Sequence, residues 1–252
     1  FMFIKDKYDS RGMFTKKKAR LVVNGSMQSK EYLESMYGSV GSPTAHMTSI
    51  LVVLGIAASR NMDISTMDVT GAFLRSDMDV PTFVRLQPSM AKIWIKFRPE
   101  DERMMTNKKE LILRLKKSLY GCSQSPLLWS KNVENFLKEL GFTQLSKDKA
   151  VYRKWTDKEL TIIVVYVDDF MVLSDSAELG KNYGDKIQER YCEVTRVTGD
   201  NLEYIGMNIF KKESGALELS MFGFIESILK QVKPKRIHSN PAGTNLFIIS
   251  GG

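Results

Sequence analysis

Two adjacent aspartates, Asp168 and Asp169, are the residues of this chain whose type and position most directly suggest chemistry. They stand between two runs of β-branched and other apolar residues, 162–165 and 170–173, which are typical of buried strands. We therefore expect a β-hairpin with both carboxylates where the chain reverses. Carboxylates beside a buried sheet are unfavourable unless they face solvent or a cation neutralises them, and Mg²⁺ prefers hard oxygen ligands of this kind. Because aspartate is also common in tight turns, the turn and metal-site interpretations both stand at this point.

A third carboxylate strengthens the metal-site interpretation. Residues 64–68 read as a short strand that ends at Asp68 and runs into a helix. Two-metal phosphoryl transfer uses carboxylates that bridge ions roughly 3.5–4 Å apart. Sequence spacing alone does not show whether Asp68 converges with Asp168 and Asp169, since that depends on tertiary structure.

Several short blocks follow one another along the chain in a recognisable order. They are residues 18–22 (KARLV), 47–50 (MTSI), 67–69 with 72–74 (MDV, AFL), 115–121 (LKKSLYG), 124–126 with Trp129 (QSP, W) and 166–169 (YVDD). In this order and near this spacing, the blocks resemble the reverse transcriptase domain of copia-type LTR retrotransposons. The resemblance runs from about residue 18 to about residue 229 and is specific because of the number of ordered blocks.

The resemblance implies an α+β fold, the right-hand polymerase core of fingers and palm, in which helices back an antiparallel palm sheet. It divides the chain into a fingers-like region (1–60), a palm segment with the first catalytic aspartate (61–98) and a nucleotide-side segment between fingers and palm (99–130). The remaining segments are the palm with the YVDD hairpin and a primer-grip-like hairpin (131–229) and an irregular tail (230–252).

The resemblance also implies an activity, RNA-directed DNA synthesis by two-metal nucleotidyl transfer. Asp68, Asp168 and Asp169 match the three catalytic, metal-binding aspartates of the family, which hold two Mg²⁺ ions, with Mn²⁺ as a substitute. The implied partners are an RNA template, a DNA primer and dNTPs. A retroelement enzyme of this kind is expected in the cytoplasm or nucleus.

Six further positions match nucleotide-binding residues of the family. They are Lys18, Arg20, Phe73, Tyr120, Gly121 and Gln124. The two cations would face the triphosphate, the Phe73 ring would exclude a 2′-hydroxyl, and the others would form the nucleotide-side turn and the helix start that lies against the template. Each has a plainer alternative: a solvated basic run at 16–20, a core aromatic at Phe73 and a glycine-containing turn at Gly121.

Composition agrees with a nucleic-acid partner. The chain has 252 residues, a formal charge of +8 and a pI near 9.3, with basic residues gathered at 16–20, 114–117 and 230–236. Cys122 and Cys192 are isolated, which predicts neither a zinc site nor a disulfide framework. The longest apolar stretch, 50–58, is far shorter than the roughly 20 residues of a membrane span, so we expect no membrane partner.

The chain departs from the copia pattern at several basic positions. Leu51, Ser123 and Leu127 stand where that family has Arg, Lys and Arg, the usual Lys-Gly-Phe is 24–26 (NGS), and the usual Leu-Ser-Gln is 219–221 (LSM). Lost phosphate contacts weaken nucleic-acid binding. A second hypothesis is therefore a host-adopted, non-catalytic protein that binds structural RNA and proteins in a large ribonucleoprotein such as a mitochondrial ribosome. The three aspartates favour the enzyme, because a scaffold has no need to keep like charges together.

Local patterns predict the remaining elements. We expect helices at 44–59, 125–140 (ending at Gly141), 177–191 and 224–232, paired strands at 83–86 and 93–97, an exposed loop at 98–109, a strand at 111–115, and a hairpin of 204–211 with 216–219.

Overall fold

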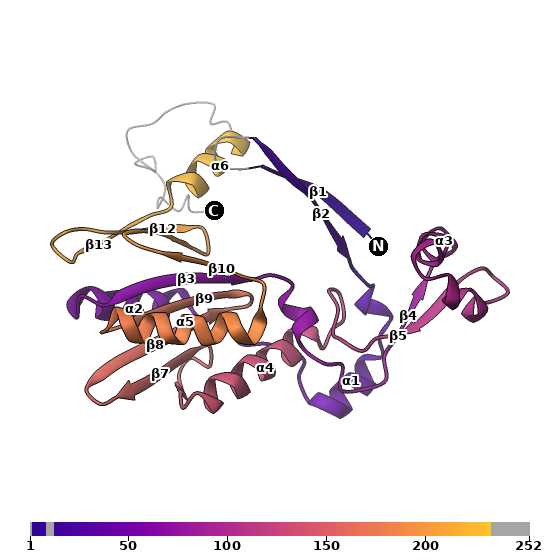
Figure 1. Cartoon of the computed structure of the whole chain (residues 1–252), viewed down its shortest axis with the longest axis horizontal. Helices are drawn as coiled ribbons and strands as arrows, with labels where there is room; N and C mark the ends of the chain where they lie inside the picture. The colour runs from indigo at the N-terminus through magenta and orange to yellow at the C-terminus, as the bar shows by residue number, and fades with distance from the viewer. Residues whose placement is uncertain (1, 9–12, 233–252) are drawn as a thin grey trace, which may run out of the picture.

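A six-stranded antiparallel sheet forms the centre of the molecule (Figure 1). The computed structural model describes residues 2–8 and 13–232. In spatial order the strands are β10 (Val194–Thr198), β3 (Asp63–Val69), β9 (Asp169–Ser174), β8 (Glu159–Tyr166), β7 (Val151–Thr156) and β6 (Thr143–Gln144). This sheet with its helices confirms the predicted α+β class and the predicted hairpin around the aspartate pair.

Helices cover both faces of the sheet. Alternate residues of β8 point to opposite faces, and both faces are apolar: Ile162 and Val164 join a core with α2 (Met47–Ser59), whereas Ile163 and Val165 join a core with α4 (Ser125–Glu139) and α5 (Ala177–Tyr191). Burial on both faces explains why the sequence shows a continuous apolar run rather than alternation. None of the described helices is long and apolar enough to cross a membrane.

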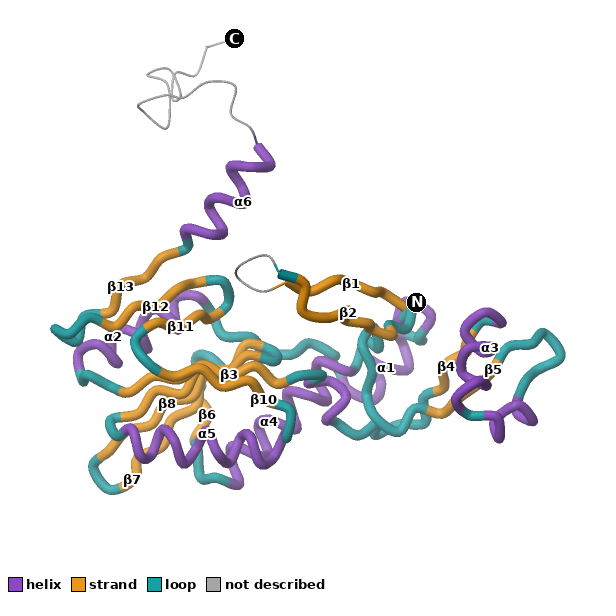
Figure 2. Tube along the Cα trace, turned by 45° about the horizontal axis from the view of Figure 1, so that its top comes forward, coloured by secondary structure: helices purple, strands orange, loops and turns teal. Residues whose placement is uncertain are grey.

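The other elements lie around this sheet (Figure 2). A two-stranded arm consists of β1 (Met2–Tyr8) and β2 (Phe14–Leu21) and leads through η1 (Gly25–Met27) to α1 (Lys30–Tyr37). The short helix η2 (Ala72–Arg75) follows β3, and a lobe beyond one end of the sheet contains β4 (Phe83–Leu86), α3 (Pro88–Phe97), η3 (Pro99–Met104) and β5 (Leu111–Arg114). A three-stranded sheet of β11 (Asn201–Tyr204), β12 (Met207–Lys211) and β13 (Leu217–Ser220) precedes α6 (Phe222–Val232).

Two local predictions were wrong, and a third had one strand too long. The expected strand 93–97 is the second half of α3, which begins at Pro88 and packs Ala91 against β4 and β5, so β4 pairs with β5. The expected loop 98–109 contains η3. The expected hairpin of 204–211 with 216–219 is confirmed by the pairing of β12 with β13. Its first strand begins only at Met207, because a tight turn at Ile205 and Gly206, both at positive φ, separates β12 from β11.

Most of the predicted helices are confirmed, and other elements were not anticipated. The helices expected at 44–59, 125–140, 177–191 and 224–232 correspond to α2, α4, α5 and α6, and Gly141 follows α4 with φ 82°. The helix α1 and the strands β7 and β10 had no prediction of their own. Residues 230–232 of the expected irregular tail are helical in α6, and the rest of that tail lies outside the described residues.

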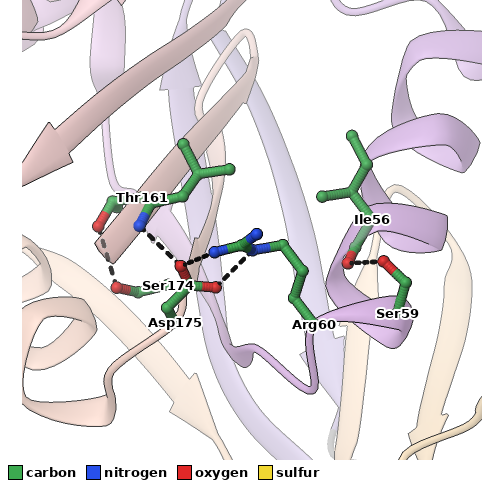
Figure 3. Close-up of polar contacts among 7 residues, drawn as sticks. Ile56, Ser59, Arg60, Thr161, Ser174 and Asp175 are labelled. Carbon is green, nitrogen blue, oxygen red and sulfur yellow. Dashed lines mark hydrogen bonds and ion pairs between the residues drawn. The ribbon is translucent and has the colours of Figure 1, made fainter. Parts of the chain in front are cut away.

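An ion pair connects α2 to the sheet at the end of β9 that is remote from the aspartate turn (Figure 3). Arg60, at the end of α2, pairs with Asp175 after β9, with 2.8 Å between Nε and Oδ1. The same carboxylate accepts the Leu160 N–H at 2.8 Å, and the hydroxyls of Thr161 and Ser174 bond at 2.9 Å. These contacts tie α2 to the ends of β8 and β9.

A buried carboxylate anchors α2 at its other end, near the aspartate hairpin. Asp148 is 5% exposed and accepts the backbone N–H groups of His46 at 2.9 Å and Ala150 at 3.0 Å. Burial opposes ionisation of Asp148, but bonds from Ser49 and these two N–H groups outweigh it and lower its pKa. The Val165 N–H donates a hydrogen bond to the Ala150 carbonyl, and the Ala45 N–H donates one to the Val165 carbonyl. The contacts around Asp148 therefore also support β8, the strand that leads into the aspartate turn.

We expect Asp148→Asn to destabilise the protein at neutral pH. The amide cannot accept both N–H groups as a carboxylate does, and an unsatisfied buried group costs about 1–3 kcal/mol. Because the folded-state pKa is lowered, the Asp148 contribution is present above the ordinary value of 3.8 and is lost as pH falls below it. Thermal unfolding should show a Tm difference from wild type at pH 7 that shrinks at acid pH; a difference independent of pH would contradict this account.

Candidate active site

The hairpin between β8 and β9 turns in two residues, Val167 and Asp168, because Tyr166 pairs with Asp169. Val167 has φ 56°, the left-handed region that β-branched residues seldom adopt. On the neighbouring strand β3, Asp68 pairs with Asp169, and the Val69 N–H donates to the Asp168 carbonyl at 2.9 Å. That bond flanks the pair, so Asp68 and Asp169 form a non-hydrogen-bonded pair, the type whose side chains lie closest. The fold thus brings the three predicted aspartates together.

Their charges act on one another. Burial raises the pKa of Asp168, and the Asp68 carboxylate adds to the effect, whereas Arg20 and Lys18 oppose it. Burial, followed by the charges of Asp168, Asp68 and Glu203, raises the pKa of Asp169 to about 6. The site therefore carries concentrated negative charge that a cation would relieve.

The three aspartates supply the donor type that a hard divalent cation prefers, but not a complete set of ligands. Among the described residues, no group of three or more His, Cys, Asp or Glu side chains is arranged to hold a metal ion. Mg²⁺ typically takes one or two carboxylates and completes its shell with phosphates and water. Asp68, Asp168 and Asp169 supply oxygen donors of that kind, and their mutual repulsion favours occupation by a cation.

Aromatic and cationic side chains lie within electrostatic reach of the aspartates. The Phe73 ring, on η2, lies 4.9 Å from the Tyr120 ring, and Arg20 lies over Tyr120 with Cζ 5.7 Å from the ring centre. Burial raises the pKa of Tyr120, and Asp168 and Asp68 add to the rise while Arg20 opposes it. Tyr120 therefore lies within the electrostatic reach of both the carboxylates and the arm.

The backbone explains why these groups meet. The Ser118 hydroxyl donates to the Phe73 carbonyl, which fixes η2 against the segment that carries Tyr120. Lys18 and Arg20 are two residues apart on β2 and so share one face of the arm. The structure brings Lys18, Arg20, Phe73 and Tyr120 of the predicted nucleotide-binding set to the aspartates.

Gly121 lies where the segment after β2 packs against the segment that carries Tyr120. It has φ 93°, and a Cβ there would lie 2.0 Å from the Val23 carbonyl oxygen. Val23 N–H also donates to the Tyr120 carbonyl at 2.9 Å. Glycine is therefore required here because the Val23 backbone approaches closely. This agrees with the plainer alternative for Gly121, a glycine-containing turn that serves the fold.

Gln124 is buried and hydrogen-bonded within the protein. Its side chain is fully buried, accepts Gln28 Nε2 at 2.8 Å, and directs its own Nε2 to the Thr82 hydroxyl at 3.4 Å. Gln28 in turn accepts the Ser123 N–H at 2.7 Å. We therefore leave Gln124 out of the residues proposed to touch the nucleotide.

Sequence reasoning gave no role to Trp129, whose indole Nε1 lies 2.6 Å from the Val167 carbonyl oxygen. A tryptophan on the predicted helix 125–140 was the available signal, since a buried indole N–H needs an acceptor. A cavity of about 690 Å³ is lined by Leu21, Val23, Met27, Phe83, Arg85 and Cys122 among others. None of the three aspartates lines this cavity.

Comparison with known proteins agrees with this geometry. Residues 2–242 match the family described as "Reverse transcriptase (RNA-dependent DNA polymerase)". The chain belongs to this reverse transcriptase family. The resemblance seen in the motifs is thereby confirmed, and the match extends it toward both ends of the chain.

Relatives of this reverse transcriptase domain include retrotransposon polyproteins. It is 29% identical over 232 residues to the "Retrovirus-related Pol polyprotein from transposon TNT 1-94" of Nicotiana tabacum, covering 91% of the chain and 16% of the relative. It is 30% identical over 185 residues to that of transposon RE1 of Arabidopsis thaliana (73% and 12%) and 25% identical over 234 residues to the Ty1-BL Gag-Pol polyprotein of Saccharomyces cerevisiae (91% and 12%). The chain therefore spans between 12% and 16% of the length of these relatives.

Among solved structures, telomerase from Candida tropicalis in complex with a fragment of telomeric RNA matches 92% of this chain and 48% of its own. The TM-score is 0.43 and the sequence identity is 12%.

We expect Asp169→Asn to raise the thermal stability of the metal-free reverse transcriptase domain. The folded-state pKa of about 6 lies above the ordinary 3.8, so ionisation of Asp169 destabilises the fold as pH rises through this interval. Solvent screens part of this repulsion. We expect a gain in Tm of about 2–4 °C above pH 6, which is the shift for roughly 1 kcal/mol in a domain of this size.

The matched control is Asp157→Asn. Asp157 is exposed in the turn at the other end of β8, with φ 55°, a conformation that asparagine tolerates equally well. Scanning calorimetry with a chelator should show no stabilisation in the control. Equal Tm values for wild type and Asp169→Asn at all pH values would show that the ionised Asp169 carboxylate, through its burial and its charged neighbours, does not destabilise the fold.

Proposed function

We propose that this chain is an RNA-directed DNA polymerase domain of a copia-type retroelement, acting on an RNA template, a DNA primer and dNTPs. The observation that carries the proposal is the placement of Asp168 beside the Asp68–Asp169 pair. The positive charges of Arg20 and Lys18 on the arm partly offset the negative charge of Asp168. Carboxylates that can bind metal cations, with basic side chains near them that can bind phosphates, suit nucleotidyl transfer. Retrotransposon polyproteins among the relatives support the template class, and the domain would work in the cytoplasm or nucleus.

The residues divide the chemistry between them. Two Mg²⁺ ions, or Mn²⁺, would supply activation of the primer 3′-hydroxyl and stabilisation of the leaving group when bound. Asp68 and Asp168 would be the main ligands, with Asp169 as the third carboxylate. Lys18 and Arg20 would bind the β- and γ-phosphates and offset the negative charge that builds up there.

Bond formation and cleavage balance within the substrates. The primer 3′-oxygen forms a bond to the α-phosphorus, the bond from that phosphorus to the bridging oxygen breaks, and pyrophosphate leaves with the electron pair. The hydroxyl proton passes to solvent. Phe73, held against Tyr120, would lie beneath the sugar and exclude a 2′-hydroxyl by its bulk.

We expect Asp168→Asn to reduce primer extension to about one-hundredth or less, because loss of a metal-binding carboxylate removes several kcal/mol of transition-state stabilisation. The measurement is extension of a DNA primer on an RNA template with dNTPs and Mg²⁺. Asp157→Asn, at the far end of the same strand, should extend at the wild-type rate. No extension by a well-folded wild type that binds RNA would instead favour the role of a non-catalytic ribonucleoprotein subunit.

We expect Phe73→Ala to relax sugar selection. Removal of the ring opens space for a 2′-hydroxyl, so the ratio of kcat/KM for dNTP over NTP should fall about tenfold or more. The neighbouring Leu74→Ala, at a position 43% exposed on the same short helix, is the matched control and should leave the ratio unchanged. An unaltered ratio in Phe73→Ala would reject Phe73 as the gate.

A further inference from the structure

One buried hydrogen bond from helix α4 reaches the turn that carries Asp168. Trp129 is 1% exposed, and its indole Nε1–H donates to the Val167 carbonyl at 2.6 Å. The ring lies edge-on to Phe170 at 6.5 Å and tilted against Tyr191 at 5.0 Å. Because these aromatic neighbours fix the plane of the indole, they also fix the direction of its N–H.

This bond completes a clamp on the backbone of Asp168. The Val167 carbonyl belongs to the peptide that precedes Asp168, and α4 holds it through Trp129. The Asp168 carbonyl belongs to the following peptide, and β3 holds it through the Val69 N–H at 2.9 Å. With both flanking peptides held, the direction in which the Asp168 side chain leaves the backbone is set.

The turn needs such a clamp. Val167 is β-branched and has φ 56°, and a strained conformation of this kind persists only where the surrounding structure over-determines it. The hairpin register ends at Tyr166 and Asp169, so strand pairing between β8 and β9 does not hold the peptide between Val167 and Asp168. Rotation of that peptide would re-aim the Asp168 carboxylate without disturbing either strand.

We propose that Trp129 is a positioning residue for the metal-binding carboxylates. Its indole N–H holds the Val167–Asp168 peptide, and thereby keeps the Asp168 carboxylate directed with Asp68 toward a divalent cation. The inference rests on the proposed function for its catalytic consequence, but the cation geometry can be measured without catalysis. Loss of an outer hydrogen bond of this type typically lowers metal affinity or activity about 10–100-fold.

The test removes the donor and keeps the shape. Incorporation of 3-benzothienylalanine at position 129 replaces the N–H with sulfur in a ring system of the same size, and Trp129→Phe is the simpler variant. The matched control is Tyr191→Phe, which removes a hydroxyl donor 3.1 Å from Asn132 Oδ1 within the same aromatic cluster. Each protein is measured for Mn²⁺ affinity without nucleotide by electron paramagnetic resonance, for kcat and KM in primer extension, and for Tm.

We expect the position 129 variants to bind Mn²⁺ about 10–100-fold more weakly and to lose a similar factor in kcat, with a smaller change in KM for dNTP. Tyr191→Phe should keep the wild-type Mn²⁺ affinity and kcat even if its Tm falls as much as that of the position 129 variants. Unchanged Mn²⁺ affinity in the benzothienyl variant, or an equal loss in Tyr191→Phe, would overturn the positioning role.

The two proposals fail in different ways. If the wild type binds Mn²⁺ but extends no primer, polymerase function is rejected, while weaker Mn²⁺ binding in the benzothienyl variant still supports the role of Trp129. If the wild type extends primers and the variant binds Mn²⁺ equally well, the role of Trp129 is rejected and the function stands. A wild type that binds no Mn²⁺ and extends no primer overturns both.

Discussion

Repulsion among three carboxylates is the constraint on which the rest of the structure depends. Asp68 and Asp169 face each other across neighbouring strands, and Asp168 occupies the adjoining turn. Such an arrangement opposes folding unless other interactions over-determine it. The sheet provides these interactions, since β8 and β9 are buried on both faces between the α2 core and the α4–α5 core. A hairpin with one solvated face would have less apolar burial to offset the repulsion.

Anchors at both ends of the hairpin reinforce this arrangement. At the remote end, the Arg60–Asp175 pair ties α2 to the sheet. At the site end, Asp148 holds the start of α2 near Val165, and Trp129 reaches the turn itself from the opposite face. The site is thus supported from both layers of helices, which suits a surface that must hold its geometry before a substrate arrives.

Two of the positions that lack the basic residues of copia-type enzymes, Asn24 and Ser123, make local structural contacts in this chain. The Asn24 side chain accepts the Ser26 N–H at 3.2 Å and so caps η1. The Ser123 N–H is bound by Gln28, and its hydroxyl lies 3.5 Å from the Gly25 carbonyl oxygen, in the tight join where a Cβ on Gly25 would lie 2.0 Å from the Gly121 oxygen. Leu51, by contrast, is 46% exposed on α2, and no contact in the structure explains the loss of charge there.

The sequence by itself determined the elements whose signal is local and strong. Apolar runs on both sides of the aspartate pair predicted the hairpin, and periodicity with end signals predicted α4 and α5, because burial and capping leave marks in neighbouring residues. Ordered motifs identified the family and the three aspartates. Residues 93–97 show the limit of such signals, since a short apolar run suits a strand or a helix until its packing partner is known.

Only the tertiary structure decided which distant residues meet. The opposition of Asp68 to Asp169, the approach of Arg20 to Tyr120 and the burial of Gln124 depend on strand register and on packing between segments about 100 residues apart, which local pattern does not encode. The same holds for Trp129, because a hydrogen bond to a backbone carbonyl depends on where that carbonyl lies and not on which residue carries it.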